Sequence, residues 1–99
     1  MDINEAHKQA LGYTKITVDA TTAEGLAQGT LGAIPSGATM ALIIPEAAIR
    51  FRDDGVDPTA SAGMPLVANQ PLPYTGTLST LKLISQSGSA DVSVAFYKG

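Results

Sequence analysis

The chain has 99 residues, a formal net charge of −3 and no cysteine. This length allows one domain that buries roughly 60–65% of its unfolded surface, and the lack of cysteine excludes disulfides, thiolate zinc sites and cysteine nucleophiles. The Lys and Arg residues are scattered, so we expect no nucleic-acid partner. The longest apolar run, 38–44, is too short to span a membrane, and the N-terminus lacks the order of an export signal.

Residues 1–12 are predicted to form an N-terminal arm or a short helix. Small and apolar side chains recur at helical spacing in this stretch, and Gly12 is a helix stop signal. The segment is too short to be a stable helix alone. His7, the chain's single histidine, lies within it, which makes histidine-based catalysis improbable.

From residue 13 the hydrophobic period changes from helical to two, which is typical of a β-strand. The stretch 13–20 predicts a half-buried strand, and 21–37 predicts a Gly-rich loop with a short strand near 29–33. In 40–44 both faces are apolar, so this strand is expected at the centre of a sheet. The next strand, 47–52, places Arg50 and Arg52 side by side on its less apolar face.

The segments "MPLVA" and "QPLPYTG" are broken by prolines and suit edge strands. Residues 79–98 show two alternating runs around "SQSGSA", which predicts a closing β-hairpin. About seven short strands with turns between them indicate an all-β, single-domain antiparallel β-sandwich or jelly roll over residues 13–99.

The run "RFRDDGVDPT" is dense in charged and turn-forming residues. Asp-Gly and Asp-Pro pairs favour chain reversal, and guanidinium groups pair with carboxylates. We therefore predict a braced loop. Its residues are Arg50, Arg52, Asp53, Asp54, Gly55, Asp57 and Pro58.

Three aspartates so close together raise the alternative of a Ca²⁺ site, but their spacing differs from that of an EF-hand loop. The adjacent arginines neutralise the carboxylates more simply. The chain has no second histidine and no G-x-S-x-G or S-x-x-K motif. We therefore expect no catalytic residues, no bound metal and no cofactor.

Four stretches of the sequence, "ALGYTKITV", "ALIIPEAAIRFRDDGVDPTASAGMPL", "YTGTLSTLKLI" and "VSVAFY", resemble a group of small virion-associated proteins of tailed bacteriophages. The resemblance covers most of residues 10–97. Its most specific part lies within 49–65. There the matching residues are Arg50, Arg52, Asp53, Asp54, Gly55, Pro58, Thr59 and Gly63.

The resemblance implies a structural protein of the virion, assembled in the host cytoplasm and present in many copies. A capsid decoration (cement) protein that contacts the major capsid protein fits this description, and so does a neck, tail or fibre component. A homo-oligomer, with a trimer as one form, is expected from closed symmetry. Met64, Pro65, Leu66 and Tyr74 are the predicted interface residues, and an exposed Tyr74 would suit a carbohydrate- or receptor-binding module instead.

Overall fold

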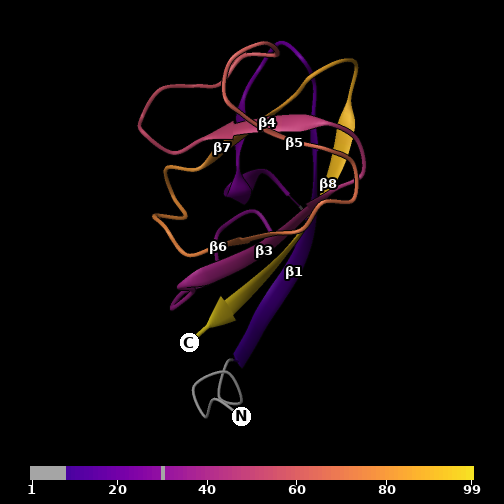
Figure 1. Cartoon of the computed structure of the whole chain (residues 1–99). Coiled ribbons are helices and arrows are strands. Elements are labelled where there is room, and N and C mark those ends of the chain that lie inside the picture. Colours follow the sequence, from indigo (N-terminus) through magenta and orange to yellow (C-terminus); the bar gives the residue numbers. More distant parts are fainter. Residues whose placement is uncertain (1–8, 30) are drawn as a thin grey trace.

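The computed structural model describes residues 9–29 and 31–99, and these residues form eight strands and one short 3₁₀ helix (Figure 1). The elements are β1 (Gln9–Val18), β2 (Glu24–Gly25), η1 (Leu26–Gln28), β3 (Met40–Pro45), β4 (Ile49–Arg52), β5 (Met64–Leu66), β6 (Leu72–Tyr74), β7 (Lys82–Ser85) and β8 (Ala90–Lys98). The predicted all-β class is confirmed. No helix of the described residues is long and apolar enough to cross a membrane.

The strands form two four-stranded antiparallel sheets. The first sheet has the order β1-β8-β3-β6 and the second has the order β2-β7-β4-β5. All the pairings are antiparallel. The chain changes sheet at every connection except that between β4 and β5. This arrangement is a β-sandwich with a shared core.

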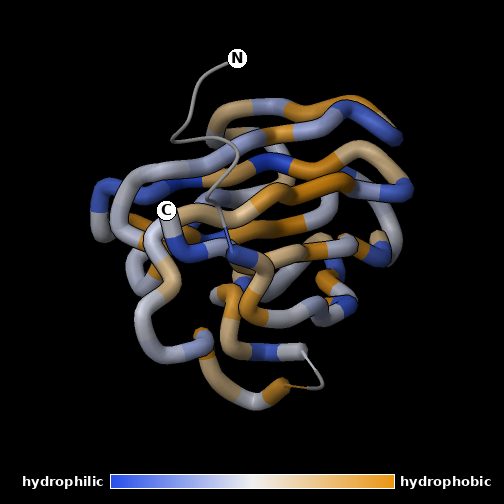
Figure 2. The backbone as a smooth tube through the Cα atoms, turned by 90° about the horizontal axis from the view of Figure 1, so that it is seen from below, coloured by the Kyte–Doolittle hydropathy of each residue, from blue (hydrophilic) through white to orange (hydrophobic). Residues whose placement is uncertain are grey.

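The core follows from the alternation of side chains along each strand. In β8, Val92, Val94 and Phe96 are fully buried, while the residues between them are half-buried. Ile16 of β1 and Leu83 of β7 are also fully buried. Because side chains alternate between the two faces of a strand, each sheet presents one apolar face to the other. Hydrophobic stretches accordingly run along the strands in Figure 2.

The N-terminal boundary differs from the predicted one. Strand β1 begins at Gln9, so residues 9–12 belong to the sandwich and are strand rather than arm or helix. Its pairing with β8 shifts between Ala10 and Gly12. This bulge interrupts the period-two pattern, so the sequence predicts a strand that starts at residue 13, four residues too late. The rest of the predicted arm, including His7, lies outside the described residues.

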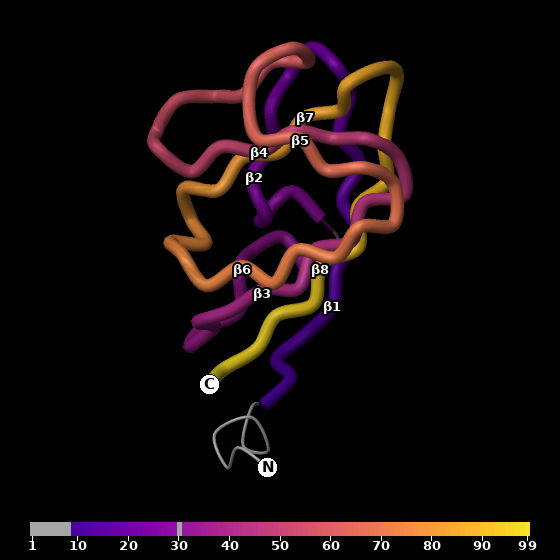
Figure 3. The backbone as a smooth tube through the Cα atoms, viewed as in Figure 1, coloured from indigo at the N-terminus to yellow at the C-terminus, as the bar shows by residue number. Residues whose placement is uncertain are grey.

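The predicted hairpin over residues 79–98 is wrong. Strands β7 and β8 lie in different sheets, where β7 pairs with β2 and β4, and β8 pairs with β1 and β3. The connection through "SQSGSA" therefore crosses from one sheet to the other, at the end of the sandwich seen in Figure 3. The alternation of apolar residues was read correctly, but both strands face the same core without being neighbours.

The predicted strand near 29–33 is also wrong, because none of the described residues of this stretch, 29 and 31–33, lies in a strand. The regular elements of the Gly-rich segment 21–37 are β2 and η1, which come just before Gly29. The Gln28 side chain bonds the edge of β1: its amide N–H donates to the Thr17 carbonyl (3.1 Å), and the Thr17 N–H donates to its oxygen (3.3 Å). A side-chain amide thus takes the place of a neighbouring strand along this part of the edge.

Three placements of strands are confirmed. Strand β3 lies between β8 and β6, as its two apolar faces predicted. Strands β5 and β6 lie at the edges of their sheets. Both edge strands contain a proline, Pro65 and Pro73, and an edge is where a missing backbone donor is tolerated.

Candidate functional site

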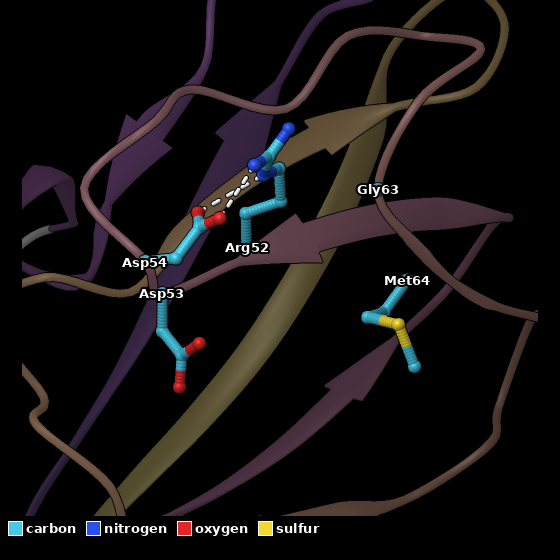
Figure 4. A pocket seen from close by; sticks show the side chains of 5 residues that line it. All are labelled: Arg52, Asp53, Asp54, Gly63 and Met64. Atoms are coloured by element: carbon cyan, nitrogen blue, oxygen red, sulfur yellow. Dashed lines mark hydrogen bonds and ion pairs between the residues drawn. The ribbon is translucent and has the colours of Figure 1, made fainter.

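A pocket of about 410 Å³ lies where the loop between β4 and β5 begins and ends. It is lined by Arg52, Asp53, Asp54, Gly63 and Met64 (Figure 4). All five residues lie within 49–65, the most specific part of the sequence resemblance, and three of them belong to the charged stretch 50–59. The loop, which is drawn beyond β4 in Figure 3, brings its two ends together because β4 and β5 pair antiparallel.

Arg52 and Asp54 form a two-point ion pair on one wall of this pocket. Arg52 Nε donates to Asp54 Oδ1 (3.0 Å) and Arg52 Nη2 donates to Asp54 Oδ2 (2.5 Å). The guanidinium holds the pKa of Asp54 down at about 2 and its own pKa is raised. Both side chains are partly exposed, so the pair stabilises the loop conformation only modestly. A carboxylate with so low a pKa is a poor general base, and its chemistry is that of an ionic contact.

Asp53 points away from this pair, as Figure 4 shows. Its carboxylate accepts a hydrogen bond from the hydroxyl of Tyr74 (2.5 Å), a residue that is buried. Burial, followed by this hydrogen bond, raises the pKa of Tyr74 to about 12. The backbone oxygen of Asp53 accepts a further bond from Thr80 Oγ1 (3.3 Å). Asp53 therefore ties the start of the loop to β6 and to the β6–β7 connection.

Arg50 braces the loop through backbone oxygens and not through a carboxylate. Its Nε donates to the Ala60 carbonyl and its Nη1 to the Gly63 carbonyl, both at 3.1 Å. These bonds fold the loop back over the outer face of the second sheet. Ile84, which pairs with Arg50, is buried there although it lies outside the main core cluster.

Glycine is required where the loop returns to β5. Gly63 has φ 139°, and a Cβ there would lie 3.1 Å from the Cβ atoms of both Arg50 and Pro58. Just before it, Thr59 and Ala62 exchange backbone hydrogen bonds of 2.8 and 3.2 Å. The tight return therefore leaves no room for a side chain, and the far end of the loop is as well held as its start.

The remaining predicted loop residues have simpler roles. Gly55 has φ 86°, as its turn position predicted. Pro58 is buried, whereas Asp57 is exposed and forms no ion pair with the described residues. Across residues 9–29 and 31–99, no group of three or more histidines and carboxylates is placed to hold a metal ion.

Two of the four predicted interface residues are not available to a partner. Leu66 (5% exposed) and Tyr74 (8%) are buried in the core, so the placement of these residues on an interface is corrected. Pro65 is exposed, and Met64 is 60% exposed although it is the first residue of β5. Sequence reasoning missed Val67, which is 64% exposed. The sequence offered one indication of this exposure, which is that Val67 comes directly after Leu66 in the segment "MPLVA" that was predicted to be an edge strand.

Comparisons with protein-family models, curated proteins and solved structures found no match.

Proposed function

We propose that this chain is a non-enzymatic structural protein of a tailed-bacteriophage virion, and specifically a capsid decoration (cement) protein that binds the head lattice in many copies. The observation that carries the proposal is the rigid loop between β4 and β5 together with β5 itself, because Met64 is exposed beside the pocket and Val67 is exposed just beyond the other end of β5. A preorganised loop with apolar side chains at its base loses little entropy when a partner binds.

The charges of this region suit binding better than catalysis. The Arg52–Asp54 pair is already neutralised, and Asp53 is occupied by the Tyr74 hydroxyl. A partner that covers Met64 and Val67 removes apolar surface from water, which is favourable. One such contact is small, but copies that are joined in a homo-oligomer bind a symmetric lattice strongly through multivalency.

The proposal includes a jelly-roll connectivity for the sandwich. It is supported by the strand orders β1-β8-β3-β6 and β2-β7-β4-β5, with consecutive strands placed in opposite sheets except at β4–β5. Eight-stranded jelly rolls occur in viral capsid proteins, and also in lectins and cupins. The connectivity is therefore compatible with the proposed role, while the role itself rests on the docking residues.

The alternative is a neck, tail or fibre position, and copy number separates the two. Quantitative mass spectrometry of purified virions, scaled to the major capsid protein, should give one copy per capsid subunit or a simple fraction of that number over the whole shell. A dozen or so copies would place the protein in the neck or tail. Absence from the particle would refute a virion role.

The docking residues have their own test, which is binding of the purified chain to heads that lack it. Met64→Asp and Val67→Asp should each weaken binding at least about tenfold, because a charge would be buried at the contact. Leu31→Asp is the matched control, since Leu31 is 46% exposed and lies beside Gly12 of β1. Equal losses in all three variants would argue against this docking site.

A further inference from the structure

The first two residues of the turn after β4, Asp54 and Gly55, carry the groups that isomerisation of an aspartate requires. In this reaction the amide nitrogen that follows an aspartate attacks Cγ of the aspartate side chain. A glycine in the second position favours the attack, because no Cβ shields its nitrogen. The sequence contains one Asp-Gly pair and no Asn-Gly pair. The reaction is therefore most favoured between residues 54 and 55.

The other two aspartates of the loop are poorly suited to this reaction. Asp57 precedes Pro58, whose nitrogen carries no hydrogen and therefore cannot close the imide ring. The nitrogen that follows Asp53 belongs to Asp54, a residue with a side chain, and the Asp53 carboxylate already accepts a bond from the Tyr74 hydroxyl. Within the loop, one pair of residues thus combines a free amide N–H with an unshielded nitrogen.

The surroundings of Gly55 leave room for the ring. Gly55 is exposed and, apart from its chain neighbours, no atom lies within 4 Å of the position that a Cβ on it would take. Its N–H makes no hydrogen bond with the described residues. A five-membered ring formed here meets no neighbouring group, and water has access to it.

The ion pair between Arg52 and Asp54 opposes the reaction. Both carboxylate oxygens accept hydrogen bonds from the guanidinium, Oδ1 at 3.0 Å and Oδ2 at 2.5 Å (Figure 4). Attack on Cγ expels one of these oxygens, and an oxygen leaves more readily from the protonated acid than from the carboxylate. The hydrogen bonds from Arg52 hold the pKa of Asp54 down at about 2, and two-point pairing also fixes the plane of the carboxylate.

We propose that Asp54 and Gly55 form a site of spontaneous conversion of aspartate to isoaspartate, and that the ion pair with Arg52 keeps this conversion slow. The Gly55 nitrogen bonds to Asp54 Cγ while a Cγ–O bond breaks, and the hydroxyl leaves with the proton of the nitrogen as water. Water then adds to the main-chain carbonyl carbon of residue 54 and the bond from that carbon to the nitrogen breaks, which leaves isoaspartate. One water is released and one is consumed, so the conversion needs no oxidant, reductant or cofactor.

Isomerisation would alter the wall of the pocket. Isoaspartate adds one methylene to the main chain, and its carboxylate is attached directly to Cα. The two-point contact with Arg52 therefore cannot form with the same geometry. A partly exposed ion pair stabilises a fold only modestly, so we expect the larger effect of this pair to be on the chemical lifetime of the loop. The inference does not depend on the proposed function.

Incubation of the folded chain at about pH 6 and about 37 °C, below the melting range of ordinary domains, is the test. After digestion, reversed-phase chromatography separates the peptides that carry residue 54, because the isoaspartyl form has the same mass and a different retention time. An endoproteinase that cuts before aspartate, and not before isoaspartate, identifies each form. Undigested samples frozen at the start show how much isoaspartate the handling itself produces.

A synthetic peptide of residues 49–60 gives the rate in a chain without the folded loop. A fall in pKa from 3.8 to about 2 lowers the protonated fraction of the acid about 60-fold. We therefore expect the folded chain to isomerise at least about tenfold more slowly than the peptide.

Variants of the folded chain assign the protection to the ion pair. Arg52→Gln should raise the rate at least about fivefold. The matched control is Lys82→Gln, since Lys82 lies opposite Arg52 in β7 and forms no ion pair with the described residues; its rate should not change. A looser loop would also raise the rate, so hydrogen exchange of the Thr59 and Ala62 amides, which bond each other's carbonyls, reports whether the loop stays folded. If Arg52→Gln opens the loop, Arg52→Lys replaces it, because lysine keeps the charge without the planar two-point pair and should isomerise faster than the unchanged chain.

Three outcomes would overturn the inference. Equal rates in the folded chain and the peptide would show that the fold gives no protection. A rate unchanged by Arg52→Gln, with hydrogen exchange of Thr59 also unchanged, would assign the protection to another part of the loop. Isoaspartate that accumulates first at Asp53 or Asp57 would place the reactive bond elsewhere. None of these outcomes would affect the copy-number test of the proposed function.

Discussion

Replacing Tyr74 with Phe tests whether the bond between the core and the loop stabilises the fold. The Tyr74 ring is buried, and its hydroxyl donates to Asp53 Oδ2. A hydrogen bond to a charged group contributes about 1.5–3 kcal/mol to stability. The Asp53 side lies near solvent, so water replaces the lost donor there, and we expect about 1–2 kcal/mol.

That loss converts into a measurable shift of the melting temperature. With 99 residues and an unfolding entropy of about 2.1 cal/mol/K per residue, about 1–2 kcal/mol lowers Tm by about 5–10 °C. Thermal unfolding followed by circular dichroism at pH 7, with calorimetry as a check on two-state behaviour, measures the shift.

The control for this prediction is Tyr97→Phe. Tyr97 is half-buried, and its hydroxyl makes no hydrogen bond with the described residues, so its loss should shift Tm by no more than about 2 °C. Asp53→Asn keeps an acceptor but removes the charge, and it should give an intermediate shift. If Tyr74→Phe has the same Tm as Tyr97→Phe, the hydrogen bond to Asp53 adds nothing to stability and our account of the loop is wrong.

Three other measurements test the packing and the electrostatics. A Cβ at Gly29 would lie 2.0 Å from a side-chain oxygen of β1. Gly29→Ala should therefore destabilise the fold by about 1–3 kcal/mol, as measured in a denaturant titration. The control is Gly25→Ala, where the nearest atom to an added Cβ lies at 3.8 Å, and it should destabilise the fold by less than about 1 kcal/mol. The pKa of Tyr74 is about 12 in the folded chain and about 10 when unfolded; the folded state therefore holds its proton more tightly, and stability should fall as the pH rises from about 10 to about 12, but not in Tyr74→Phe. Asp54 has a folded pKa of about 2, below its ordinary value of 3.8, so its contribution is present above about pH 4 and lost as the pH falls through 2; Arg52→Gln should raise that pKa in an NMR titration, and an unchanged value would contradict the ion pair.

The local pattern of the sequence was sufficient to identify most strands and the face that each turns to the core. Alternation along 92–96 marks the residues that are buried, and the two apolar faces of 40–44 mark a central strand. Prolines marked the edge strands β5 and β6. These features follow from the two-residue repeat of a strand and from the missing proline donor, both of which are local properties of the chain.

Pairing between strands was decided by the tertiary structure. A period of two says which side chains face the core, but both sheets of a sandwich face the same core, so β7 and β8 looked like a hairpin although they belong to different sheets. The same reason explains Leu66 and Tyr74. Each lies in a short edge strand whose inner side could be recognised only once its partner strand was known.

The sequence also placed Arg50 and Arg52 together on one side of a strand, next to a turn, without showing what each would bind. Arg52 reaches Asp54 two residues away, a local contact that the spacing allows. Arg50 binds the carbonyls of Ala60 and Gly63, and the Asp53 carboxylate accepts a bond from Tyr74, 21 residues further along the chain. Only the path of the folded loop brings these groups within hydrogen-bond distance, because a bond between residues distant in the sequence depends on the positions of the strands that carry them.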